Sequence, residues 1–309
     1  MSSTGYFPGC SLCGTAVDYD ASLRAVAAKL EIGLREVPDW LCCGATSAHA
    51  LDRASALCLA ADTLAKARKA GLDRVLAPCA MCYQRLATVV HEVEREPALG
   101  PRLASALGEP PDLGLERVRA VSLIGWLDAM PDEAITQRLK RPLKGMKVAS
   151  YYGCLLVRPP AATGRSDFEK PRSMERVVRL LGGEPVRWPM ATECCGASCG
   201  ISRTEAVQRL TSRICGAARA CGAQLVAVAC PMCHANLDMR QDGAVTPNET
   251  LLPIVYLTQL MGLAFGVPEA ALGFEGHFVP VEPALSALED AKVVVGAVSA
   301  DESSAVGAR

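Results

Sequence analysis

The five residues LCCGA at Leu41–Ala45 recur as ECCGA at Glu193–Ala197, and this repeated stretch determines how the chain is organised. One cysteine precedes each copy by a long gap, and a Cys-x-x-Cys pair follows each copy. The matching cysteines are Cys10 and Cys154, then the pairs Cys79/Cys82 and Cys230/Cys233. The second copy is longer by about eight residues, which fall around Arg158–Arg172. Internal similarity of this kind indicates a duplication.

The length of the chain agrees with two copies of one domain. Its 309 residues correspond to two domains of about 150 residues each. We expect a first domain at 1–140, a second at 141–275, and a partly flexible C-terminal extension at 276–309. Smaller expectations concern connecting segments: a hinge at Arg141–Gly145, a Pro- and Gly-rich loop at Glu96–Asp112, an extended Val279–Pro283, a short helix at Ala284–Ala291 and a frayed Ser299–Arg309.

Hydrophobic patterning predicts an α/β fold with short parallel sheets. The apolar runs Val75–Ala77 and Leu225–Ala229 each end at a Cys-x-x-Cys, and Lys147–Tyr152 is a further predicted strand. Helical stretches precede the first two runs, at Leu51–Ala70 and Thr204–Cys221, and each is closed by a glycine, Gly71 or Gly222. Strands that alternate with helices form parallel sheets, and ligands collect at the carboxyl ends of such strands. The repeated cysteines fall at those ends.

Composition excludes several classes of protein. Lys and Arg total 32 against 33 Asp and Glu, so the chain lacks the basic excess of a nucleic-acid-binding protein. Thr250–Pro268 is uncharged, but prolines, glycines and polar residues interrupt it, so an amphipathic packing helix is expected there and not a membrane span. Fifteen cysteines, an odd number, follow an N-terminus without an apolar signal core. They indicate metal ligands in a reducing, cytoplasmic compartment.

Five repeated cysteines per half exceed the needs of simple metal sites. Structural zinc and an ordinary iron–sulfur cubane are each saturated by four ligands. Adjacent cysteines before a glycine suit a sharp bend in which both sulfurs face one polynuclear centre. The Cys-x-x-Cys pairs lie where a strand gives way to a helix, and the helix dipole there stabilises thiolates. The ferredoxin spacing of cysteines is absent from the sequence.

This doubled arrangement resembles the CCG-domain (cysteine-rich) family. The likeness is strongest to the B-type subunits of heterodisulfide reductase, including their bacterial sulfur-oxidising relatives, and it extends to Tyr151–Pro160 and Pro253–Leu260. The resemblance implies two Rossmann-like CCG domains related by a pseudo-twofold axis, which hold two non-cubane [4Fe-4S] clusters. By motif position, the first set of ligands is Cys10, Cys42, Cys43, Cys79 and Cys82, and the second set is Cys154, Cys194, Cys195, Cys230 and Cys233.

The resemblance also implies a function. In this family a substrate disulfide is split reductively between the two clusters, each of which supplies one electron. The chain would be the catalytic oxidoreductase component of a heterodisulfide reductase-like complex in sulfur metabolism, with iron–sulfur C-type and flavin-bearing A-type subunits as partners. No Gly-x-Gly-x-x-Gly occurs, so no flavin or nucleotide is expected in this chain. The substrate, a small-thiol heterodisulfide or sulfur on a lipoyl-type carrier, is left open, as is the direction.

Other residues allow a functional or a structural interpretation. His234 follows Cys233 and is a candidate proton donor or a structural histidine; His49 is in a similar position, and His91 and His277 are expected to be solvated. Arg158 and Arg165 are candidates to orient an anionic substrate or are surface residues. We expect Cys13 and Cys199 to pack near the clusters, and expect burial on helices for three further cysteines, Cys58, Cys215 and Cys221.

Two alternative functions fit the same cysteines. One is an electron-transfer CCG subunit in a complex that oxidises a 2-hydroxyacid such as lactate or glycolate. The other is a zinc-stabilised scaffold without catalysis.

Overall fold

The computed structural model describes residues 3–45, 51–241 and 250–286, and it contains two four-stranded parallel sheets. The first sheet has the order β2-β1-β3-β4, and the second has the order β6-β5-β7-β8. The strands of the first are β1 Ser3–Tyr6, β2 Gly33–Glu36, β3 Arg74–Leu76 and β4 Arg119–Val121. Those of the second are β5 Lys147–Tyr151, β6 Glu184–Val186, β7 Leu225–Val228 and β8 Ile254–Tyr256. The equal strand order confirms the duplicated α/β fold.

Helices cover both sheets. In the first half they are α1 Gly9–Leu12, α2 Val17–Lys29, α4 Arg53–Lys69, α5 Ala80–Arg95, α6 Leu99–Leu107, α7 Leu123–Asp128 and α8 Asp132–Thr136. In the second half they are α9 Pro160–Thr163, α10 Ser173–Leu180, α11 Thr204–Ala220, α12 Pro231–Met239 and α13 Leu257–Ala264. Every residue of β7 is buried, as a parallel strand covered on both faces requires.

The two long helices before the central strands end as the sequence predicts. Gly71 and Gly222 adopt left-handed backbone conformations, with φ of +73° and +80°. The next amides, of Leu72 and Ala223, donate hydrogen bonds back to the carbonyls of Ala67 and Ala218, at 2.9 and 3.1 Å. Each helix is thus closed by a Schellman-type turn that needs glycine, and each turn leads the chain directly into β3 or β7.

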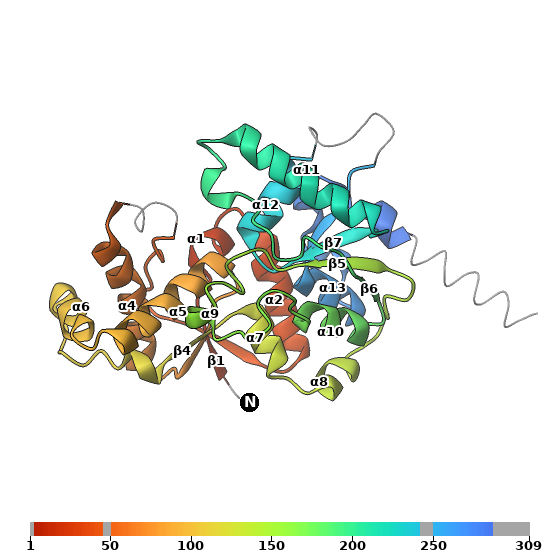
Figure 1. Cartoon of the computed structure of the whole chain (residues 1–309). Coiled ribbons are helices and arrows are strands. Elements are labelled where there is room, and N and C mark those ends of the chain that lie inside the picture. Colours follow the sequence, from red (N-terminus) through yellow and green to blue (C-terminus); the bar gives the residue numbers. More distant parts are fainter. Residues whose placement is uncertain (1–2, 46–50, 242–249, 287–309) are drawn as a thin grey trace, which may run out of the picture.

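The halves exchange helices across their interface. Helix α2 of the first half packs against α13 of the second, while α10 of the second half packs against α7 of the first (Figure 1). Because α2 and α10 both follow the first strand of their half, this reciprocal packing is what a pseudo-twofold relation produces. The extra segment of the second copy also crosses over, since its helix α9 lies beside α5 of the first half (Figure 1).

Two of the segment predictions within the two halves were wrong. Glu96–Asp112 contains helix α6, because Leu99, Leu103 and Ala104 form one buried face and Pro101 lies in the first turn, where proline is tolerated. Gly108, with φ of +67°, ends this helix. The stretch Thr250–Pro268 forms β8 and then α13, whose eight residues are all buried, so the helix is not amphipathic. A helix enclosed on all sides has no polar face.

The C-terminal extension is described only as far as residue 286. The chain turns helical at 282, earlier than expected, so Val279–Pro283 is not extended throughout. The remainder of the expected helix Ala284–Ala291 and the expected frayed end Ser299–Arg309 lie outside the described residues. At the expected hinge, the amides of Lys140 and Arg141 both donate to the carbonyl of Ala264. None of the helices within 3–45, 51–241 and 250–286 combines the length and apolarity that a bilayer crossing needs.

A buried pair of hydroxyls joins the two halves and provides a test of their coupling. Ser22 in α2 and Thr258 in α13 lie 2.7 Å apart, and both side chains are fully buried. Ser22→Ala or Thr258→Val leaves the other hydroxyl buried without this partner, which we expect to cost about 1–3 kcal/mol in each case. The double variant should cost less than the sum of the two. Anaerobic urea unfolding measures this coupling; strictly additive losses would contradict it.

Candidate functional site

The ten repeated cysteines follow the carboxyl ends of the three strands that begin each half. In the first half, Cys10 follows β1, Cys42 and Cys43 follow β2, and Cys79 and Cys82 follow β3. Their thiols form a chain of contacts: Cys10 interacts with Cys42, Cys82 interacts with Cys79, and the Sγ atoms of Cys43 and Cys82 are 3.3 Å apart. The folded chain therefore gathers all five thiols of this half.

The second half repeats this arrangement. Cys154 interacts with Cys194, Cys230 interacts with Cys233, and the Sγ atoms of Cys195 and Cys233 are 3.6 Å apart. All fifteen cysteines of the chain are free thiols.

The two sets of thiols meet across the interface between the halves. The thiols of Cys79 and Cys230 lie close enough to interact, and both residues are 2% exposed. Beside them, the rings of Tyr19 and Tyr256 stack 4.1 Å apart and 5° from parallel, one ring from each half. The hydroxyl of Tyr19 donates to the carbonyl of Pro78, at 3.3 Å. Two buried, stacked tyrosine rings thus lie next to the place where the two sets of thiols meet.

Exposure of the thiols falls from one side of the site to the other. Cys10, Cys42 and Cys194 are exposed and Cys154 is half-buried, whereas the remaining six thiols are buried. A molecule that approaches from solvent therefore reaches the Cys10 and Cys154 side of each set first.

Glycines make each set of five possible. Gly44 and Gly196 have φ of +70° and +78°, and in this conformation their amides donate to Sγ of Cys42 and Cys194, at 3.5 and 3.3 Å. Gly9 and Gly153 have φ of +64° and +63°, and a Cβ on either would lie 3.0 Å from a thiol, that of Cys82 or Cys233. The positive φ favours glycine at all four positions, and Gly9 and Gly153 need it for space as well.

The thiols share protons unequally. A hydrogen bond from Cys82 lowers the pKa of Cys43 to about 7, and one from Cys154 lowers the pKa of Cys194 to about 6. Hydrogen bonds from Cys233 and Cys79 likewise lower the pKa of Cys230, while the pKa of each of these two donors is raised. Thiolate is the form that binds metal, so these sets are disposed to bind a soft cationic group and release protons.

The donor set fits an iron–sulfur group. Each half presents five sulfurs linked by successive thiol–thiol interactions, one more sulfur than a mononuclear zinc site or a cubane uses. The space beside Gly9 and Gly153 that a Cβ would fill lies directly against a thiol of each set. The residues present can therefore hold a polynuclear, thiolate-ligated cofactor in each half.

Two neighbours of the thiols were not found from the sequence, Arg85 and Asn236. Each stands three residues after the last cysteine of its Cys-x-x-Cys pair, so the two occupy equivalent positions in the repeat. This shared position is the feature of the sequence from which both could have been predicted. The charge of Arg85 contributes to lowering the pKa of Cys43. The buried Asn236 amide donates to the carbonyl of Cys195, at 3.1 Å, and contacts its Sγ, at 3.7 Å. One set thus lies beside a cation and the other beside a neutral amide.

The histidines differ from expectation. His234 is 7% exposed and stacks on Tyr256 with ring centroids 4.4 Å apart, and burial followed by the proximity of His277 lowers its pKa to about 3. Its role as proton donor stays a prediction. The expectation that His277 is solvated was wrong: its side chain is fully buried, because Gly273 brings this segment against α2. His91 is half-buried, and His49 lies outside the described residues.

The two arginines of the extra segment are held by protein groups. Arg158 donates to the carbonyl of Thr192 at 2.9 Å and pairs with Glu169 at 3.0 Å. Arg165 pairs with Asp167 and Asp128, at 2.8 and 3.2 Å. Orientation of an anionic substrate by either residue would therefore require that it give up protein contacts.

The five remaining cysteines do not share one environment. Cys215 is fully buried, as expected, and Cys58 is half-buried. The expectation for Cys221 was wrong: it follows α11 at the surface and is exposed. Cys13 and Cys199 are exposed as well.

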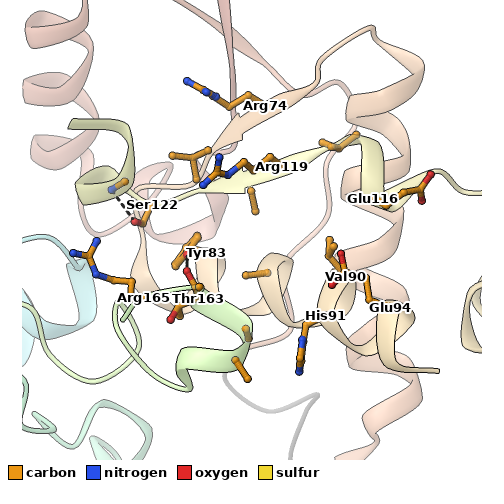
Figure 2. Close-up of a pocket in the computed structure, with 18 of the residues that line it drawn as sticks. Arg74, Tyr83, Val90, His91, Glu94, Glu116, Arg119, Ser122, Thr163 and Arg165 are labelled. Carbon is orange, nitrogen blue, oxygen red and sulfur yellow. Dashed lines mark hydrogen bonds between the residues drawn. The ribbon is translucent and has the colours of Figure 1, made fainter. Parts of the chain in front are cut away.

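A cavity of about 640 Å³ lies away from the thiols. It runs along the outer strand β4 and is closed by α5 and by the extra segment at residues 161–165 (Figure 2). There Tyr83 reaches across and donates to the carbonyl of Thr163, at 3.2 Å (Figure 2). Since none of the ten repeated cysteines lines this cavity, it is separate from the cysteine site.

The fold and the paired cysteine sets define a duplicated cysteine-rich α/β protein. The chain belongs to the CCG family of cysteine-rich domains, whose family model matches residues 4–87 and 148–238. The two matches coincide with the two halves and contain all ten repeated cysteines.

Relatives of this chain are components of reductases. It is 31% identical to the 8-methylmenaquinol:fumarate reductase membrane anchor subunit of Wolinella succinogenes over 276 residues, which cover 89% of this chain and 96% of that relative. It is 27% identical to the B-type component of the ferredoxin/F420H2-dependent CoB-CoM heterodisulfide reductase of Methanosarcina acetivorans, over 90% of this chain and 94% of the relative. A protein of Archaeoglobus profundus that is similar to this B-type component is 23% identical, over 88% and 94%. These likenesses support a CCG-type iron–sulfur redox subunit.

A solved structure shares the fold. A hypothetical protein from Helicobacter pylori superimposes with a TM-score of 0.72 at 12% identity, and the match covers 91% of this chain and 52% of that one.

Alanine at Gly153 should damage one set of thiols selectively. A Cβ there would lie 3.0 Å from Cys233 Sγ, whereas at Gly145, which also has a positive φ, it would meet nothing within 4 Å. Both variants incur the same kind of backbone strain, of order 1–2 kcal/mol. We expect Gly153→Ala to lose about half of the bound iron and Gly145→Ala to keep it, as measured by anaerobic iron and sulfide analysis. Equal iron content in both variants would show that iron binding does not need the close approach of the Gly153 backbone to the Cys233 thiol.

Proposed function

We propose that this protein is the iron–sulfur catalytic subunit of a heterodisulfide reductase-like complex and carries out disulfide/thiol or carrier-bound sulfur redox chemistry. In this proposal Cys10, Cys42, Cys43, Cys79 and Cys82 hold one non-cubane [4Fe-4S] cluster. Cys154, Cys194, Cys195, Cys230 and Cys233 hold the other. The single observation that supports it most is the contact between the two cysteine sets at Cys79 and Cys230. Because the two sets meet there, clusters bound to them would form two neighbouring one-electron centres.

The chemistry of disulfides requires such a pair. Reduction of an S–S bond takes two electrons and two protons and yields two thiols. Clusters bound in the two halves would supply one electron each. The protein would position both sulfurs of the substrate at the exposed side of the sets, near Cys10 and Cys154, while the stacked Tyr19 and Tyr256 exclude water from the buried side.

Other subunits would complete the electron path. The heterodisulfide reductase relatives are B subunits of CoB-CoM heterodisulfide reductases. We propose an iron–sulfur C-type and a flavin-bearing A-type partner in the cytoplasm, with no flavin or nucleotide in this chain.

A second candidate function is electron transfer without disulfide chemistry. The 31% identity to a fumarate reductase subunit favours a role in passing electrons between a dehydrogenase or reductase and another carrier. An electron-transfer subunit of a complex that oxidises a 2-hydroxyacid would have the same kind of role. In this case the two clusters would respond to a redox partner and would not bind sulfur compounds.

EPR spectra of the anaerobically purified protein distinguish the two functions. If the disulfide function holds, small-thiol disulfides or a lipoyl compound should change the cluster signals after one-electron oxidation or reduction. Spectra that respond to a flavin dehydrogenase and stay unchanged with every disulfide and persulfide would favour electron transfer.

Substitution of one adjacent cysteine in each half tests the assignment of ligands. Cys43→Ser and Cys195→Ser should each lose about half of the iron, because each removes a ligand from one cluster only. The exposed Cys221, which no repeat contains, provides the control: Cys221→Ser should retain full iron. Loss of iron in neither ligand variant, or zinc without iron in the wild type, would contradict the assignment.

The different neighbours of the two sets should make the clusters unequal. A nearby cation stabilises the reduced, more negative state of a cluster. Arg85→Gln should therefore lower the midpoint potential of the first cluster by on the order of 50 mV and leave the second unchanged. An EPR-monitored redox titration measures both potentials. The exposed Arg102, in α6, serves as control, and an equal shift in Arg102→Gln would show a nonspecific charge effect.

A further inference from the structure

Three possible metal ligands lie together outside the cysteine sets. Asp18 comes from α2, His234 from α12, and His277 from the segment that follows α13. One ligand atom of each lies within 4.8 Å of the other two. The three come from the first half, the second half and the C-terminal extension, so their meeting depends on tertiary structure.

One ring nitrogen of His234 is buried and unused. Its Nε2 has no hydrogen-bond partner among the described residues, although the residue is only 7% exposed. The backbone of Ile254 interacts with the same ring. A metal-binding histidine commonly has one ring nitrogen directed at a backbone carbonyl and the other free for the ion, and the unpartnered Nε2 of His234 fits that use. Tyr256, stacked at 4.4 Å, holds the ring in place.

His277 also presents a lone pair. Its Nε2 lies 2.9 Å from Nε2 of Gln259 and 3.4 Å from Oδ2 of Asp18. The amide of Gln259 is oriented by its neighbours, since its oxygen accepts from the amide of Tyr256 and its nitrogen donates to the carbonyl of Leu272. A nitrogen of Gln259 faces His277, so the Nε2 lone pair of His277 accepts that hydrogen bond, which a metal ion would have to displace. The 3.4 Å to Asp18 is close to the separation of about 3.3 Å between two ligands of tetrahedral zinc.

The surrounding structure holds these ligands in position. The carboxylate of Asp238, also in α12, accepts hydrogen bonds from the amides of Phe278 and Val279, at 2.7 and 3.1 Å. Gly273 approaches Asp18 so closely that a Cβ on it would lie 2.6 Å from Cβ of Asp18. The residues that carry the three ligands are therefore fixed by contacts other than their own.

We propose that Asp18, His234 and His277 form a zinc site. The Nε2 lone pair of His234 has no donor among the described residues, and the ring lies close to the carboxylate of Asp18 and the imidazole of His277, an arrangement that a cation between the three would stabilise. Zinc takes nitrogen and oxygen ligands of this kind at about 2.0–2.2 Å, and water can complete its four ligands. The ion would join the first half, the second half and the C-terminal segment, and so would act as a clamp. This inference does not depend on the proposed disulfide chemistry.

Metal analysis of the full-length, anaerobically purified protein tests the site. The wild type should contain about one zinc per chain in addition to its iron, and His277→Ala should lose the zinc and keep the iron. The half-buried His91, which lies in the separate cavity, provides a matched control: His91→Ala should keep both metals. Equal zinc in the wild type and in His277→Ala, or no zinc after incubation with Zn²⁺, would overturn the proposal.

X-ray absorption at the zinc edge identifies the ligands. The site predicts nitrogen and oxygen near 2.0–2.1 Å, whereas zinc in a cysteine set would show sulfur near 2.3 Å. A sulfur shell alone overturns the site. If His277→Ala does not fold, Asp18→Asn keeps the shape of the side chain and should weaken zinc retention at least tenfold. A wild-type protein that contains zinc with nitrogen and oxygen ligands but no iron would contradict the disulfide proposal and leave this one standing, so the two failures are distinguishable.

Discussion

The contact between Cys79 and Cys230 is the constraint on which the rest of the structure depends. Each residue follows one of the two inner strands of its sheet, β3 or β7, so the carboxyl edges of the two sheets must face each other for the thiols to meet. The exchange of α2 and α10 between the halves satisfies that requirement, because each helix follows the first strand and covers the partner half. Burial of the stacked Tyr19 and Tyr256 then seals the junction from one side. The packing of the two halves and the position of the cysteine site therefore both follow from the way the carboxyl edges of the two sheets face each other.

Duplication produces two similar sites, yet their surroundings are not equal. The glycines beside the thiols are the same in both halves, because backbone conformation and close approach allow nothing larger. The residues three positions after each Cys-x-x-Cys differ, and a cation faces one set while an amide faces the other. In the proposed function, two clusters with these different neighbours would have different potentials. The zinc site, built from residues without counterparts in the other half, adds to the same asymmetry.

Much of the fold could be predicted from local signals. The spacing of the cysteines revealed the duplication, and Gly71 and Gly222 marked the ends of two helices at the residues where the chain turns. Failures came where packing overrides composition. Glu96–Asp112 looks like a loop from its Pro and Gly content, but Leu99, Leu103 and Ala104 bury one face and make it a helix. His277 looks like a solvated tail residue, but Gly273 packs its segment onto α2 and encloses the ring.

The repeated pattern of cysteines and glycines determined the number of halves, the α/β class and the ten thiols of the site, because thiol chemistry and left-handed glycine turns are written in residue type and spacing. Tertiary structure decided which half faces which, that Cys79 meets Cys230, that Arg85 and Asn236 lie beside opposite sets, and that Asp18, His234 and His277 converge. These are contacts between residues up to 259 positions apart. They depend on how helices pack across an interface, and no local propensity encodes that packing.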